Sequence, residues 1–207
     1  VQIGCKDVAL AAGLNEDAPF VVHGLDTDHA AVAATRTALR AANMAGTASA
    51  TVFDGIHLPY AENMVNLLIA ESLGGVSMDE VMRVLVPNGV VHLKRNGEWK
   101  KAVKLWPKEF GNWSHGLCNP NNNPVSADTA LGPHNSLKWE GLPKFARHHD
   151  TLGSVGAMVS SNGRLFYIVD ESPASLVHLP GNWQLVARDA FNGIVLWKRP
   201  ITEWVDH

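Results

Sequence analysis

Acidic side chains and a glycine stand directly after four strand-like runs in the first half of the chain. Gly4 follows the run VQI, Asp26 ends PFVVHGLD, Asp54 ends SATVFD, and Glu71 follows VNLLIA. In an open parallel sheet, ligands bind at the edge where the carboxyl ends of the strands meet. A strand, a tight glycine turn and a helix N-terminus can hold a nucleotide-like cofactor there. The spacing therefore predicts a cofactor site at that edge, to which these four residues contribute.

The acids suggest separate roles in such a site. Asp26 follows Gly4 by 22 residues, and a carboxylate at this place can accept hydrogen bonds from both vicinal hydroxyls of a ribose. Asp54 is placed to bind the amino edge of a purine. Any one such acid alone is more commonly a solvated loop residue. Three acids in register along alternating units favour a binding site.

The elements that position these residues alternate between strand and helix. Asp28 is expected to cap a helix over roughly 29–44, and Ser77 a second helix that Pro87-Asn88-Gly89 ends. Asn96-Gly97 predicts a hairpin turn after the last strand. The expected strands are 1–3, 19–26, 49–55, 65–72 and 90–94, and a further helix-like run follows Gly4. Such alternation predicts an α/β fold with a mostly parallel sheet.

The character of the sequence changes near residue 107. Residues 107–153 are rich in proline, glycine, asparagine and histidine and show little periodicity. From 154 onward, four runs separated by turns predict antiparallel strands: SVGAMVS, RLFYIVDE, NWQLVARDAF and GIVLWKRP. We therefore expect an α/β domain over 1–106, an irregular linker over 107–153, and an all-β segment over 154–207.

Composition narrows the classes of function. The chain has 207 residues, is 46% hydrophobic and 18% charged, and carries a net charge of −3. The absence of a basic block argues against nucleic acid as a partner, and no apolar run reaches the roughly 18 residues of a membrane span. The start at Val1 without a methionine suggests a piece of a longer protein. A small molecule is the expected ligand or substrate.

The order of the motifs over residues 1–95 resembles the core of a class I S-adenosylmethionine-dependent methyltransferase. VQIGCKDVALA is similar to the glycine-rich first motif, and GLDTD to the ribose-binding end of the second strand. VFDG resembles the adenine loop, and MRVLVPNGVVHLK the helix, turn and fifth strand. The resemblance implies a Rossmann-like fold, S-adenosylmethionine as the cofactor, and methyl transfer to an unknown acceptor as the reaction.

The resemblance also assigns positions around that cofactor. Glu71 would lie by the reacting end. The remaining cofactor-binding candidates are Gly4 and Asp7 at the methionine part, Asp26 and Thr27 at the ribose, and Asp54 and Gly55 at the adenine. No residue is assigned a catalytic role.

Three departures concern the first motif. Gln2 stands where an acid usually anchors the amino group of the cofactor, and Lys6 and Val8 replace two glycines. Side chains there narrow the approach of the backbone to a ligand. An alternative interpretation is therefore that the chain keeps the methyltransferase-type fold but has lost the activity. A dinucleotide-binding protein is a third alternative, which the single glycine disfavours.

The end of the chain resembles a different family. The stretch from Ala187 to Trp197, ARDAFNGIVLW, is similar to the tryptophan-docking motif of quinoprotein-like β-propellers, with Asn192 in place of a threonine. The resemblance implies one propeller blade whose remaining blades lie outside this chain, and Trp197 packing on a neighbouring blade. It does not imply a bound quinone. It slightly favours a periplasmic or exported protein, and it supports a non-catalytic scaffold or ligand-binding protein as the alternative function.

The irregular segment contains the remaining candidates for chemistry. His115, His148, His149 and Asp150 could hold a metal ion, but residues that fix a domain joint explain them more simply, so no metal is expected. All seven tryptophans lie between Trp99 and Trp204. Packing of strands explains most of them.

Overall fold

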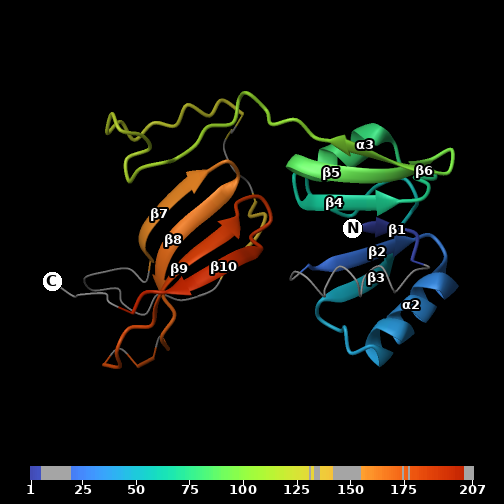
Figure 1. Ribbon diagram of the computed structural model, residues 1–207, viewed down its shortest axis with the longest axis horizontal. Coiled ribbons are helices and arrows are strands. Elements are labelled where there is room, and N and C mark those ends of the chain that lie inside the picture. Colours follow the sequence, from blue (N-terminus) through green and yellow to red (C-terminus); the bar gives the residue numbers. More distant parts are fainter. Residues whose placement is uncertain are drawn as a thin grey trace. The chain divides into compact units, whose positions relative to one another are not determined.

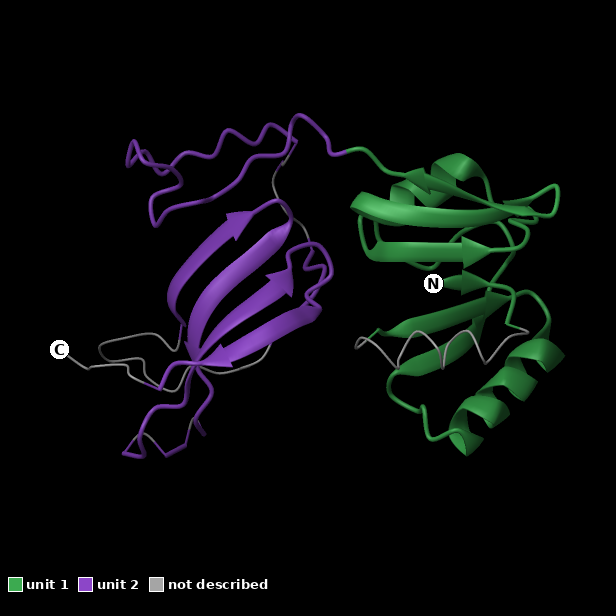
Figure 2. Cartoon of the chain, in the orientation of Figure 1, with its two compact units in different colours: residues 1–105 green, residues 106–207 purple. Residues whose placement is uncertain are grey.

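The computed structural model describes residues 1–5, 20–130, 132, 136–141, 155–173, 175–176 and 178–202. The chain divides into two compact units, Val1–Leu105 and Trp106–His207, called here the N-terminal and the C-terminal unit (Figures 1 and 2). Each unit contains one sheet with its own buried core. No helix among the described residues is both long and apolar enough to cross a membrane.

A six-stranded sheet forms the N-terminal unit, with the strand order β3-β2-β1-β4-β5-β6 (Figure 1). The first five strands of that order pair in parallel, and only β6 runs antiparallel to its neighbour β5. The strands are β1 (Gln2–Ile3), β2 (Val22–Asp26), β3 (Ala48–Val52), β4 (Val65–Ala70), β5 (Leu85–Arg95) and β6 (Glu98–Val103). The predicted α/β class with a mostly parallel sheet is confirmed.

In the described part of the chain, α2 (His29–Ala41) and α3 (Met78–Val84) connect these strands. The Asp28 carboxylate accepts a hydrogen bond from the Ala30 amide, and the Ser77 hydroxyl accepts one from the Glu80 amide, as the capping pattern predicts. The predicted helix after Gly4 lies outside the described residues.

The Pro87-Asn88-Gly89 stretch does not separate helix from strand, so that expectation was wrong. Helix α3 ends at Val84, and β5 runs through all three residues. Asn88 adopts a φ of 64°, and the pairing with β4 shifts register between Val65 and Leu67. The three residues are therefore a bulge within the strand. Leu85 before them is fully buried and pairs with Val65 of β4.

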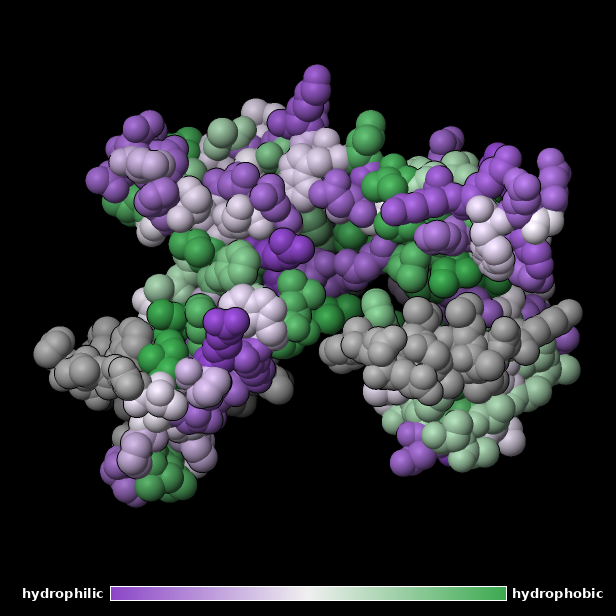
Figure 3. Space-filling model, in the orientation of Figure 1, coloured by the Kyte–Doolittle hydropathy of each residue, from purple (hydrophilic) through white to green (hydrophobic). Residues whose placement is uncertain are grey.

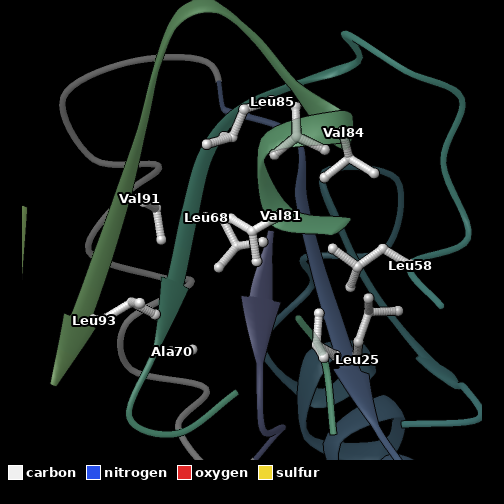
Figure 4. Close-up of a cluster of buried hydrophobic side chains, with 11 residues drawn as sticks. Leu25, Leu58, Leu68, Ala70, Val81, Val84, Leu85, Val91 and Leu93 are labelled. Carbon is white, nitrogen blue, oxygen red and sulfur yellow. The ribbon is translucent and has the colours of Figure 1, made fainter. Parts of the chain in front are cut away.

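The main hydrophobic core of the N-terminal unit lies between α3 and the strands β2, β4 and β5 (Figure 4). Leu25, Leu68, Val81, Leu85 and Val91 each have 0% of their surface exposed. Burying a side chain of this size contributes roughly 1.5–3 kcal/mol. This core fixes the strand ends that carry the polar candidates.

Four antiparallel strands in the order β10-β9-β8-β7 form the sheet of the C-terminal unit. They are β7 (Val155–Ser161), β8 (Arg164–Asp170), β9 (Trp183–Asp189) and β10 (Val195–Pro200), which confirms the four predicted strands. Trp113 forms a two-way backbone bridge with Ser160 of β7. Part of the segment expected as a linker is thus bonded to this sheet.

The turn between β9 and β10 is braced by its own side chains. Asp189 Oδ1 accepts from the amide of Phe191 at 2.8 Å, and Asn192 Oδ1 accepts from the amide of Ile194 at 3.1 Å. Gly193 has a φ of 74°. A Cβ placed on it would lie 2.5 Å from Trp139 Cδ2, and Trp139 Nε1 donates to the Ala190 carbonyl at 3.1 Å. The indole of Trp139 therefore lies against this turn.

Candidate functional site

A cavity of about 550 Å³ opens at the carboxyl edge of the N-terminal sheet. It lies where the strand order reverses, between β1 and β4, which is the usual binding place in open α/β sheets. Five of the predicted site residues line it: Gly4, Asp26, Thr27, Gly55 and Glu71. Of the other two predicted site residues, Asp7 lies outside the described residues and Asp54 does not line the cavity.

Asp26 holds the turn after β1 against the end of β2. Its Oδ2 accepts from the Cys5 amide at 3.0 Å, and its Oδ1 accepts from the Asp28 amide at 3.1 Å. The Gly4 amide donates to the Leu25 carbonyl at 2.7 Å. These bonds fix the carboxylate at the cavity wall before any ligand arrives, which is the preorganisation that a binding site needs.

The turn itself leaves its backbone open to the cavity. Gly4 has a φ of 90°, which a side chain rarely allows, and a Cβ there would meet no atom of the described residues within 4 Å. Next to it, Cys5 is 4% exposed, and burial raises the pKa of its thiol to about 11. Cys5 is therefore a packing residue, since a thiol with that pKa stays protonated at neutral pH.

Asp54 does not line the cavity, although its neighbours Phe53 and Gly55 do. Its Oδ1 accepts from the amides of Ile56 and His57, and its Oδ2 pairs with His57 Nδ1 at 2.7 Å. The backbone and side-chain bonds from His57, with that from Ile56, lower the pKa of Asp54 to about 2. In this arrangement Asp54 shapes the loop after β3 and directs its oxygens to that loop.

Helix α3 holds the same loop from the other end. Glu80 Oε1 accepts from the Leu58 amide at 2.8 Å, while Arg83 donates to the carbonyls of Tyr60 and Leu58 at 2.9 and 3.2 Å. Arg83 also forms a two-bond pair with the Glu80 carboxylate, both at 2.7 Å. The pair joins α3 to the loop that contributes Gly55 to the cavity.

The Glu80 pair predicts a loss of stability in acid. Hydrogen bonds from Arg83 lower the pKa of Glu80 to about 2, against roughly 4.3 for a glutamate in an unfolded chain. Its contribution is present in full above about pH 5 and is lost as the pH falls toward 2. In Glu80→Gln, the free energy of unfolding from urea titrations should fall less steeply over this range than in the wild type. Glu98→Gln, at the exposed start of β6, is the control and should keep the wild-type slope.

Two parts of the cavity wall were not predicted from the sequence. One is the loop 73–75 after β4, and the other is Trp99 of β6. A Cβ on Gly75 would lie 2.9 Å from the Gly55 carbonyl oxygen, so the loops after β3 and β4 touch. The Asn96-Gly97 turn could have located Trp99, because the hairpin register pairs Trp99 with Lys94 at the end of β5.

Glu71, Lys94 and Trp99 form a contiguous group at this end of the cavity. Lys94 Nζ donates to Glu71 Oε1 at 2.6 Å and lies 5.8 Å from the centroid of the Trp99 ring. Both side chains of the ion pair are more than one third exposed, so the pair adds little stability. The group matters for function because Glu71 and Trp99 both line the cavity.

The weak metal candidates do not come together in the described part of the chain. His115 Nδ1 is bonded to the Ser114 hydroxyl at 2.9 Å, at an exposed position. His148, His149 and Asp150 lie outside the described residues. Among the described residues, no three metal-ligating side chains form a group that could hold an ion.

No protein-family model matches the chain, and no curated protein matches its sequence. Solved structures match its N-terminal part. The [4+2]-cyclase SpnF is 23% identical with a TM-score of 0.41, over 44% of this chain and 36% of that chain. A putative S-adenosyl-L-methionine-dependent methyltransferase from Methanococcus maripaludis is 19% identical, with a TM-score of 0.41. That match covers 44% of this chain and 45% of the other. A putative sarcosine dimethylglycine methyltransferase from Galdieria sulphuraria is 17% identical, with a TM-score of 0.40. That match covers 44% of this chain and 37% of the other. The match spans less than half the length of each of these three chains.

Proposed function

We propose that the N-terminal unit binds S-adenosylmethionine in the cavity at the carboxyl edge of its sheet and transfers the methyl group to an acceptor. The observation that carries the proposal is that Gly4 and Asp26 line the same cavity. An open backbone turn and a preoriented carboxylate line the same cavity at the point where the strand order reverses. When bound, this cofactor supplies a methyl group activated by a sulfonium charge.

The residues present fit the cofactor at most positions. Asp26 would accept hydrogen bonds from the ribose hydroxyls, and Gly4 leaves room for the methionine part. Gln2 lines the cavity, and its amide oxygen would accept a hydrogen bond from the cofactor amino group in place of a carboxylate. At the adenine end, Phe53 and Gly55 line the cavity in place of the predicted Asp54.

The proposal is tested by calorimetric titration of the full chain with S-adenosylmethionine and with S-adenosylhomocysteine. We expect micromolar binding of both, and a loss of more than about tenfold in affinity in Asp26→Asn, because a hydrogen bond to a charged group contributes about 1.5–3 kcal/mol. Asp79→Asn removes the same charge from an exposed position in the first turn of α3 and should bind as the wild type does. No binding at millimolar concentration would refute the proposal.

The C-terminal unit supports a second candidate, a non-catalytic scaffold or ligand-binding protein built on a propeller-type repeat. The supporting observation is the indole of Trp139 against Gly193, with its Nε1 bonded to the Ala190 carbonyl. Trp197, four residues after Gly193, is 40% exposed, and the centroid of its ring lies 6.1 Å from that of the Phe166 ring. A tryptophan that packs on the turn between two strands has a structural role, which is what a scaffold or binding protein needs. The absence of cofactor binding in the titration above would favour this candidate.

A further inference from the structure

We propose that the group Glu71, Lys94 and Trp99 binds the methyl acceptor, and that the acceptor is a hydroxyarene, a planar aromatic ring with a hydroxyl group. The inference rests on the proposed function, since it assigns the acceptor side of the same cavity. Glu71 and Trp99 line that cavity, and Lys94 contacts both of them. On the side that would face the cofactor, Asp26 ends β2, and Gly55 lies in the loop after β3.

Trp99 supplies a flat apolar surface where the surrounding surface is polar. Hydrophilic side chains gather over the β5–β6 hairpin (Figure 3), and all six residues of β6 are exposed. The side chain of Trp99 nevertheless lines the cavity and remains 51% exposed. Its cross-strand neighbour Lys94 contacts one part of the ring, and the rest is open to the cavity and to solvent. An indole at a cavity wall favours a planar ring, which stacks on it at an offset.

The charges of the group select among planar acceptors. The Lys94 ammonium already lies beside both Glu71 and the Trp99 ring, so an acceptor with a second ammonium would be repelled. An acceptor whose reacting group is a carboxylate would be repelled by Glu71, because it carries no proton that could neutralise that side chain. A hydroxyl on a neutral ring avoids both costs. It also gains from Lys94 once its proton has passed to Glu71, because Glu71 is then neutral and the adjacent positive charge stabilises the phenolate.

The same three side chains would serve the transfer step. The hydroxyl proton passes to the Glu71 carboxylate, and the Lys94 ammonium stabilises the negative charge that develops on the hydroxyl oxygen. That oxygen bonds to the methyl carbon and displaces the donor sulfur, which keeps the electron pair of the broken carbon–sulfur bond. The sulfonium thereby becomes a neutral thioether, and an aryl methyl ether is formed. Trp99 holds the ring in place and takes no part in the proton transfer.

The test uses 4-nitrophenol as the probe, because its absorbance reports both binding and ionisation. The full chain is titrated with the probe in the presence and in the absence of S-adenosylhomocysteine. We expect the bound phenol to ionise at a pH about one unit lower than the free phenol. Trp99→Ala should weaken probe binding about tenfold. Lys94→Met should remove the change in ionisation of the probe.

Matched variants make the result specific. Trp197→Ala removes another exposed tryptophan, and Lys100→Met removes the lysine that pairs with Leu93 in the same hairpin. Both should behave as the wild type. Equal losses in Trp99→Ala and Trp197→Ala, or an unchanged ionisation in Lys94→Met, would overturn the inference. Binding of S-adenosylhomocysteine without any response to the probe would overturn it and leave the proposed function standing. Without binding of S-adenosylhomocysteine the proposed function fails, and the probe variants alone decide whether the hydroxyarene site exists.

Discussion

Gly193→Ala is expected to destabilise the C-terminal unit by about 3 kcal/mol. The added Cβ would lie 2.5 Å from Trp139 Cδ2 and 2.6 Å from Cε3, so the indole must leave the turn. That movement breaks the bond from Trp139 Nε1 to the Ala190 carbonyl and exposes the ring, a loss comparable to a large-to-small substitution at a packed tryptophan. The φ of 74° adds a smaller backbone cost. Urea unfolding followed by circular dichroism measures the change.

A double substitution separates the effect of the clash with Trp139 from the effect of backbone strain at Gly193. In a Trp139→Ala background the indole is already gone, so adding Gly193→Ala should cost only about 1 kcal/mol, the cost of the positive φ. Gly116→Ala is the control within the same unit, since a Cβ there meets no atom within 4 Å. It should leave the unfolding midpoint unchanged. Simple additivity of the two substitutions would contradict the contact between Trp139 and Gly193 as the cause.

The parts of the fold that the sequence predicted are those that local patterns determine. Asp28 and Ser77 cap helices through bonds to residues two or three positions away, so their effect is visible in a short window. Asn96-Gly97 fixes the β5–β6 hairpin for the same reason, with both residues at positive φ. Alternation of strands and helices then placed Gly4, Asp26 and Glu71 at one edge, because parallel strands end together.

The parts that the sequence could not predict depend on tertiary contacts. Asp54 follows its strand as the other acids do, yet it does not line the cavity, and its oxygens bond the loop that follows it. The bulge at Asn88 depends on the pairing of β5 with β4, since the register shift is defined by both strands. Trp139 reaches Ala190 across 51 residues, and no local pattern specifies that contact. Propensity and spacing predict elements and edges, whereas the direction of each side chain follows from packing.

Gly75→Ala is expected to cost about 2 kcal/mol of stability in the N-terminal unit and to alter the cavity. The new Cβ would lie 2.9 Å from the Gly55 carbonyl oxygen, a backbone atom that cannot move without its loop. Overpacking of this kind typically costs 1–3 kcal/mol. The loops after β3 and β4 must separate, and both of them line the cavity. Urea unfolding measures the stability, and the amide resonance of Gly55 in heteronuclear spectra reports the movement.

Gly74→Ala provides the matched comparison one residue away. Gly74 has a φ of 58°, but a Cβ there meets no atom of the described residues within 4 Å, so the substitution adds backbone strain without a clash. It should cost about 1 kcal/mol and leave the Gly55 resonance in place. A shift of that resonance in Gly75→Ala alone would establish that contact between the two loops shapes the cavity. Equal spectra for both variants would mean that the loops adjust independently, and the cavity would then owe its shape to the strand ends.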